Sequence, residues 1–169
     1  LAGVRYVVDC GLVKARSFSA RLGADALAVV PVSQAQARQR AGRAGREAPG
    51  KCFRLYTEAA FRGLAPDTVP EIQRVALGST VLQLKALGVG DVLGFDFLDP
   101  PPRGALLRAV ELLLALGALR AADGGLTPLG SAMARLPVEP AHGRVLLAGL
   151  ATGCAPDALA VVAMASTDA

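Results

Sequence analysis

Apolar residues in the first third of the chain occur in short runs, which predict buried strands rather than amphipathic helices. The run VRYVV at positions 4–8 is typical of a strand in a parallel sheet. Two further strands are predicted at Leu27–Val32 and Lys51–Tyr56. The stretch between Lys14 and Gly23 is polar, and it is predicted to be irregular.

A helix is predicted between the second and third strands, because Ser33 is a suitable N-cap and Pro49-Gly50 forms a turn. Strand, helix and strand in this order indicate an α/β layer, in which ligands bind at strand ends and helix N-termini. These elements correspond to about the last third of such a layer. They are too few for a complete nucleotide-binding domain.

Beyond a break in composition at Pro66–Pro70, the apolar positions follow a helical period. Two helices are predicted to end at Gly88 and Gly117, a turn at Asp123–Gly125 predicts a small β-wing, and Thr127 caps another helix. Helix, helix, wing and helix resemble a winged-helix module, and a helical bundle begins after it at residue 141. The predicted fold class is therefore α/β followed by mostly α.

The nearly uncharged stretch from residue 145 to residue 166 is long enough to span a membrane. Pro156-Asp157 interrupts it, and Asp157 can begin a second helix, so two packed helices are predicted instead.

Residues 39–46, QRAGRAGR, carry the chain's most informative chemistry. If they are helical, Gln39, Arg43 and Arg46 share one face, which presents an amide and two bidentate guanidinium donors suited to a phosphate. Gly42 and Gly45 each cost a helix about 1 kcal/mol relative to alanine, which suggests close approach by backbone or ligand. The alternatives are a Gly/Arg-rich segment that binds RNA loosely and a solvated helix face.

Composition and net charge exclude few fold classes or partner classes. Apolar residues make up 53% of the 169 residues and the net charge is +4, which allows a core and permits a polyanionic partner. Basic residues crowd one stretch: Arg38, Arg40, Arg43, Arg46, Lys51 and Arg54. Three distant cysteines without CxxC spacing predict no metal site, and the single His142 is assigned no role. The chain starts without methionine and shows no signal peptide, so we expect it to be part of a longer protein.

The octamer resembles motif VI, the arginine-finger motif, of DEAH-box RNA helicases. Four further segments resemble the same DEAH/RHA family in that family's order: GKCFRLYTE (50–58), TVPEIQR (68–74), STVLQLKALGVGDVLGFDFLDPPP (79–102) and LTPLGSAMARLPVEP (126–140). Within the family, the chain is most similar to the spliceosome-associated eukaryotic branch. A bacterial HrpA-like helicase is the second choice.

The resemblance implies three domains: residues 1–66 as the C-terminal part of the second RecA-like domain, 67–138 as a winged helix, and 139–169 as the start of a ratchet-like bundle. It implies that Arg43 and Arg46 are arginine fingers on the γ-phosphate of ATP. Gln39 helps to position that phosphate and the attacking water, and Gly42 belongs to the same nucleotide site. Arg40 is expected to make a structural contact within the domain.

The resemblance also implies a nuclear ATPase that remodels RNA in pre-mRNA splicing. Its cofactors are ATP and Mg²⁺, held mainly by parts of the family's enzymes that this sequence lacks. Its partners are RNA, spliceosomal proteins and a G-patch activator, and no membrane. Lys14 falls in the family's RNA-facing region, although a solvated lysine beside a strand explains it equally well.

Two departures from the family pattern change the expectation. The GxxxxGK[ST] loop and the DEAH box are absent from the sequence, so this chain alone is predicted not to hydrolyse ATP. Ala2 stands where some relatives carry an aspartate that contacts ribose, which predicts looser nucleotide selectivity. Alternatives to the helicase hypothesis are a non-enzymatic RNA- or protein-binding module and a gene-model fragment.

Overall fold

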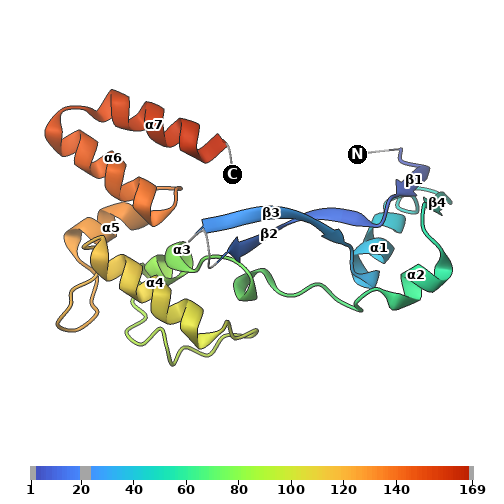
Figure 1. Ribbon diagram of the computed structural model, residues 1–169, viewed down its shortest axis with the longest axis horizontal. Coiled ribbons are helices and arrows are strands. Elements are labelled where there is room, and N and C mark those ends of the chain that lie inside the picture. The colour runs from blue at the N-terminus through green and yellow to red at the C-terminus, as the bar shows by residue number, and fades with distance from the viewer. Residues whose placement is uncertain (1–2, 20–23, 168–169) are drawn as a thin grey trace. The chain divides into compact units, whose positions relative to one another are not determined.

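The computed structural model describes residues 3–19 and 24–167, so the expectation for Ala2 lies outside the described residues (Figure 1). Within these ranges the chain forms four strands, seven α-helices and one short 3₁₀ helix. It divides into two compact units. Unit 1 comprises the residues up to Ser17 and Leu27–Pro70, and unit 2 comprises Phe18–Ala26 and the chain from Glu71 onward.

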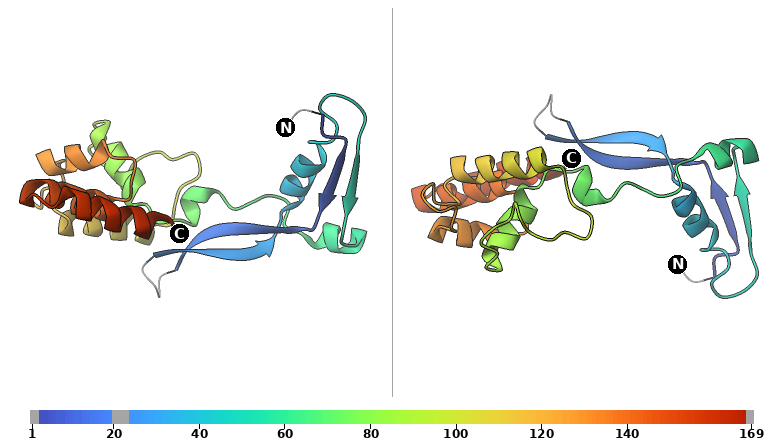
Figure 2. Two further views of the ribbon diagram at one scale, coloured as in Figure 1. Left: turned by 90° about the horizontal axis from the view of Figure 1, so that it is seen from above. Right: turned by 90° about the horizontal axis from the view of Figure 1, so that it is seen from below.

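Unit 1 contains a parallel pair of strands, β1 (Tyr6–Asp9) and β4 (Lys51–Arg54), with Val8 opposite Phe53. Both views of Figure 2 show the two strands side by side. Helix α1 (Gln34–Ala41) packs against β1, and α2 (Glu58–Gly63) follows β4. The predicted parallel α/β layer is therefore confirmed for the first and third predicted strands. Sequence analysis did not anticipate α2, although Thr57 supplies its N-cap.

The second predicted strand does not join this sheet, which corrects the sequence-based expectation. It is β3 (Ala24–Pro31), and it pairs with β2 (Leu12–Ser19) in a separate two-stranded ribbon whose strands run in opposite directions (Figure 1). The polar stretch beginning at Lys14 was predicted to be irregular, and that prediction was wrong as far as Ser19. A ribbon needs no buried face, because cross-strand hydrogen bonds satisfy its backbone even where the side chains are polar.

From Glu71 onward, unit 2 begins with the 3₁₀ helix η1 (Glu71–Gln73) and is then mostly helical, as predicted. Its first three α-helices are α3 (Gly78–Ala86), α4 (Arg103–Ala115) and α5 (Pro128–Ala134). Gly88 and Gly117 follow α3 and α4 with φ of 91° and 72°, a conformation that glycine adopts readily. The predicted wing is present as a single antiparallel bridge between Leu119 and Leu126, and the Thr127 hydroxyl accepts the N–H of Gly130 to cap α5.

The core of unit 2 is one contiguous cluster of buried apolar side chains. It consists of Leu77, Val81, Leu82, Val92, Leu106, Ala109, Leu113, Ala118, Leu119 and Met133. These residues come from α3, α4, α5 and the segments between them, so the cluster joins the helices into one packed body.

The last two helices are α6 (Pro140–Thr152) and α7 (Ala155–Thr167), which confirms the prediction of two packed helices. Gly153 ends α6 with φ of 78°, and a Cβ on Gly149 would lie 2.5 Å from the Cβ of Ala158, so the pair packs closely. No helix in the described part of the chain is long and apolar enough to cross a membrane.

Candidate functional site

The segment carrying the QRAGRAGR motif begins in α1, whose N-terminus is firmly capped. The Ser33 hydroxyl accepts the Gln36 N–H at 3.1 Å, and the Gln36 side chain accepts the Ser33 N–H at 3.1 Å. This reciprocal capping box satisfies two of the helix's otherwise unpaired donors. It confirms Ser33 as the N-cap predicted from the sequence.

The motif is helical only in its first half, which corrects the expectation of a single helical face. Helix α1 ends at Ala41, and the Gly42 N–H still bonds the Arg38 carbonyl, four residues earlier. Residues 43–45 continue as successive turns in which each N–H bonds the carbonyl three residues earlier, as Arg43 does to Arg40. Arg46 lies beyond these turns, in a bend. Gly42 and Gly45 help to explain why the helix stops, because glycine is unfavourable in a helix and both residues closely follow Ala41.

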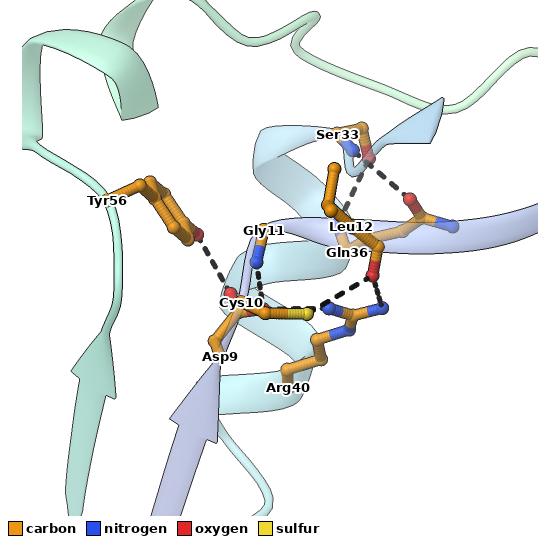
Figure 3. Close-up of polar contacts among 8 residues, drawn as sticks. All are labelled: Asp9, Cys10, Gly11, Leu12, Ser33, Gln36, Arg40 and Tyr56. Atoms are coloured by element: carbon orange, nitrogen blue, oxygen red, sulfur yellow. Dashed lines mark hydrogen bonds and ion pairs between the residues drawn. The ribbon is translucent and has the colours of Figure 1, made fainter. Parts of the chain in front are cut away.

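A network of polar contacts around Asp9, at the end of β1, ties the strand to α1 and to the end of β4 (Figure 3). Asp9 is 1% exposed, and its carboxylate accepts hydrogen bonds from the Arg40 guanidinium at 2.7 Å, the Gly11 N–H at 3.0 Å and the Tyr56 hydroxyl at 2.8 Å. Arg40 also donates to the Leu12 carbonyl at 2.9 Å. The expected structural role of Arg40 is therefore confirmed.

The electrostatics of this network follow from burial and hydrogen bonding. Burial by itself raises the pKa of Asp9, but the donors Gly11, Arg40 and Tyr56 together outweigh it, and the pKa lies below its usual value. Burial and the hydrogen bond to Asp9 raise the pKa of the Tyr56 hydroxyl. Asp9 is thus an anion over the physiological range, and it holds Arg40 in place.

The far end of the motif is also anchored. Ala44 is buried, and a Cβ on Gly50 would lie 2.5 Å from the Arg5 carbonyl oxygen and clash with that of Ala44 as well. Only glycine therefore fits at position 50. The Glu47 carboxylate accepts the N–H of Gly3 at 2.9 Å. Between these anchors the backbone is held while the side chains of residues 43 and 46 extend outward.

The predicted site residues all lie at the surface of unit 1. Gln39, Gly42, Arg43 and Arg46 are exposed. No described residue forms an ion pair or a hydrogen bond with the guanidinium of Arg43 or Arg46. The structure brings these four residues together on one short stretch, whereas Lys14 is exposed on β2 and makes no described contact with them.

The motif glycines differ from Gly50 in what surrounds them. A Cβ on Gly45 would meet nothing within 4 Å, and one on Gly42 would meet only helix carbonyls at 3.5 Å. The described chain itself therefore does not require glycine at position 45. The free space in front of it is available to a ligand.

A GxxxxGK spacing does occur at Gly45–Lys51, but it is not a phosphate-binding loop. Cys52 replaces the required Ser or Thr, and Lys51 starts strand β4 rather than a helix. No cluster of three or more His, Cys, Asp or Glu side chains in the described ranges could hold a metal ion.

Sequence analysis missed the residues that position the motif, namely Asp9, Tyr56 and Gly50. The signal for Asp9 was present in the sequence, because an acidic residue at the end of a buried strand needs a partner. Analysis also missed a pocket of about 370 Å³ beside the motif, lined by Arg5, Tyr6, Pro49, Gly50 and Lys51.

Known protein-family models match roughly the last third of the chain. Residues 109–138 match the helicase associated domain (HA2), winged-helix, and residues 139–169 match the helicase associated domain (HA2), ratchet-like.

Individual relatives match nearly the whole chain. It is 52% identical over 165 residues to the pre-mRNA-splicing factor ATP-dependent RNA helicase prp22 of Schizosaccharomyces pombe, covering 97% of the chain and 14% of that protein. It is 50% identical to the pre-mRNA-splicing factor ATP-dependent RNA helicase DEAH10 of Arabidopsis thaliana, covering 99% of the chain and 23% of the relative. It is also 50% identical to the probable ATP-dependent RNA helicase DHX35 of Homo sapiens, covering 97% of the chain and 23% of that relative. The chain thus spans less than a quarter of each of these relatives.

Proposed function

Because the chain belongs to the DEAH-box RNA helicase family, we propose that it is part of an ATP-dependent RNA helicase that remodels RNA or RNA–protein complexes in pre-mRNA splicing. The named splicing factors, 50 to 52% identical to this chain, support the assignment. Their eukaryotic sources favour it over a bacterial HrpA-like enzyme.

In this proposal Arg43 and Arg46 neutralise the charge that develops on the transferred phosphoryl group, and Gln39 orients the γ-phosphate and attacking water. The observation that carries it is the pair of exposed guanidinium groups with no ion pair to any described residue, on a backbone anchored at both ends. The anchored backbone fixes where both side chains begin, and their guanidinium groups are free to form paired hydrogen bonds with phosphate oxygens. Arginine fingers typically contribute about 10³–10⁵ in rate, or about 4–7 kcal/mol.

The residues present fit ATP as one wall of its site. Open space at Gly45 leaves room for phosphate oxygens beside the two arginines. Bound ATP supplies the phosphoryl group and the chain supplies positive charge toward it. For Mg²⁺ the described residues offer no ligand cluster, so we propose that other parts of the enzyme hold it.

The domain assignment is likewise proposed: residues 1–66 as part of the second RecA-like domain, 67–138 as winged helix, and 139–169 as the start of the ratchet bundle. The two family matches adjoin at residues 138 and 139, which supports the second boundary. Apart from Phe18–Ala26, which belongs to unit 2, the two compact units divide at Pro70, close to the first boundary. A nuclear location, spliceosomal partners, a G-patch activator and an RNA contact at Lys14 complete the proposal.

The decisive experiment replaces Arg43 by alanine in the intact enzyme. RNA-stimulated ATP hydrolysis should fall by about 10³-fold or more while the melting temperature stays unchanged. Arg103→Ala, an exposed arginine at the start of α4, is the matched control and should keep normal turnover. Near-normal turnover by Arg43→Ala would refute the arginine-finger role.

A second candidate is a binding module without catalysis, and the winged-helix match favours it. The 169-residue chain, which has neither the GxxxxGK[ST] loop nor the DEAH box, should then bind RNA with an affinity that falls steeply with salt. Both candidates expect this chain alone to lack ATP turnover. Steady hydrolysis by the purified chain would contradict both.

A further inference from the structure

Two arginines of unit 1 converge on one aromatic ring, at a place separate from the QRAGRAGR turns. The guanidinium carbon of Arg54, on β4, lies 4.2 Å from the ring centroid of Phe61, on α2. The guanidinium carbon of Arg38, on α1, lies 5.9 Å from the same centroid. Three elements of the unit therefore contribute one side chain each to this cluster, which we call the Arg38–Arg54–Phe61 site.

The site is held in position by its neighbours. Arg38 donates to the Gln34 side-chain oxygen at 2.9 Å, and the Gln34 amide donates to the carbonyls of Arg62 and Leu64 at the end of α2. Stacking on the ring restrains Arg54 in the same way. These contacts reduce the side-chain entropy that would be lost when a ligand binds.

Neither arginine forms an ion pair with an acidic side chain in the described part of the chain, although both are exposed. Other arginines of the unit are neutralised: Arg40 pairs with Asp9 and Arg62 pairs with Glu58. Two unneutralised cations around one ring repel each other, and an anion placed between them removes that repulsion.

We propose that the Arg38–Arg54–Phe61 site binds a phosphate group of single-stranded RNA, outside the ATP site. The inference rests on the proposed RNA helicase function. Guanidinium forks match phosphate oxygens in pairs, whereas an ammonium acts as a point charge. Arginine stacked beside an aromatic ring also supports an unpaired base, which an acidic peptide cannot exploit.

The test measures equilibrium binding of a fluorescent oligouridylate of about 12 nucleotides to the 169-residue chain, without ATP, over a range of salt concentrations. The double variant Arg38→Ala/Arg54→Ala should bind roughly tenfold or more weakly at about 0.1 M salt, with a salt slope smaller by about 1.4. The matched control is Arg103→Ala/Arg135→Ala, which removes two exposed charges from unit 2 and should change neither value by as much.

A charge-preserving variant separates specific recognition from bulk charge. Arg38→Lys/Arg54→Lys should retain the salt slope and still lose affinity, because lysine neither forks onto phosphate nor stacks as guanidinium does. Tyrosine fluorescence follows unit 1, which holds both tyrosines, and circular dichroism follows mainly unit 2. Unchanged melting of each variant by both probes checks that the fold is intact.

Each remaining outcome overturns a defined statement. If the unaltered chain fails to bind the oligonucleotide even at low salt, the RNA-binding part of the proposed function fails and this site fails with it. If the alanine double variant matches its control, only this site is refuted. Polyglutamate serves as a second probe, which offers carboxylates without bases. If the alanine double variant loses polyglutamate binding but keeps full RNA affinity, the site binds a protein carboxylate and the RNA assignment is overturned.

Discussion

The two units achieve order by different means. Unit 2 buries a contiguous cluster of apolar side chains, including Leu113 at 0% exposure. In unit 1 the apolar face of the β1–β4 pair is open, with Tyr6, Val8, Phe53 and Leu55 between 52% and 69% exposed. Unit 1 buries smaller apolar residues, Val32, Ala37 and Ala44. It is held further by the Asp9 network, the capping box and the close backbone approach at Gly50.

This difference indicates how each unit contributes to function. A parallel sheet normally has helices on both faces, so the open face of unit 1 is suited to cover by a further part of the proposed helicase. Its polar contacts fix the position of a few side chains rather than a large core. Unit 2 packs around its own apolar core, and unit 1 carries the residues proposed for the chemistry.

Two optical probes can follow the two units separately in the same chain. Both tyrosines, Tyr6 and Tyr56, lie in unit 1 and the chain has no tryptophan, so tyrosine fluorescence reports on unit 1. Unit 2 contains five of the seven α-helices, so far-ultraviolet circular dichroism reports mainly on unit 2.

The largest effect is expected from Leu113→Ala in unit 2. Removing a fully buried leucine leaves a cavity, and the free energy of unfolding should fall by about 2–5 kcal/mol. Urea titration should show the loss in the circular dichroism transition, with little change in tyrosine fluorescence. Leu112→Ala, at a neighbour that is 43% exposed, is the control and should cost far less. Equal losses would contradict the core assignment.

Next in size is Gly50→Ala in unit 1. Its Cβ would clash with two backbone carbonyls, of Ala44 and Arg5, which cannot rotate away. The tyrosine transition should therefore lose about 1–3 kcal/mol, in line with other overpacked sites. Gly63→Ala, where a Cβ meets nothing within 4 Å, provides the comparison. If the two variants unfold alike, the close approach at Gly50 is not what anchors the motif.

A smaller effect, and one that depends on pH, is expected from Asp9→Asn. Losing the charged hydrogen bond to Arg40 should lower the stability of unit 1 by about 1–2 kcal/mol at neutral pH. The folded pKa of Asp9 lies below its unfolded value, so its contribution is present above the unfolded pKa near 4 and is lost as pH falls through the folded pKa.

The stability of unit 1, measured from the tyrosine fluorescence transition, should therefore fall toward acid pH in the unaltered chain. It should depend less on pH in Asp9→Asn. The wing offers a contrast within unit 2: Arg120 lowers the pKa of Asp123 to about 2, but this pair is exposed and solvent screening weakens its effect on stability. An equally steep acid dependence in Asp9→Asn would show that another group controls unit 1.

The same contrast explains how far the sequence predicted the structure. Unit 2 was predicted well, since helical periodicity and the stops at Gly88 and Gly117 are local signals. Ser33 was identified for the same reason. β2 was missed because its polar residues pair only with β3, and strand pairing is a non-local property.

For the candidate site, the residue types were predicted and their arrangement was not. The period of 3.6 placed Gln39, Arg43 and Arg46 on one helical face, but the helix ends at Ala41. Arg43 follows in a turn and Arg46 lies in the bend after it. Asp9, Tyr56 and Gly50 act through contacts with residues more than 30 positions away or through backbone proximity. Neither kind of contact has a spacing that can be read from one sequence.

The smallest effect on stability, with a large effect on function, is expected from Gly45→Ala. A Cβ there meets no protein atom within 4 Å, and alanine restricts the unfolded chain, so stability should change by less than about 1 kcal/mol. If phosphate oxygens approach this backbone in the intact enzyme, the added methyl group obstructs them, and RNA-stimulated ATP hydrolysis should fall by at least tenfold. Gly63→Ala, equally open and outside the motif, should leave hydrolysis unchanged. Full activity in Gly45→Ala would show that the open space is not occupied during turnover, and that the arginines reach the nucleotide from farther away.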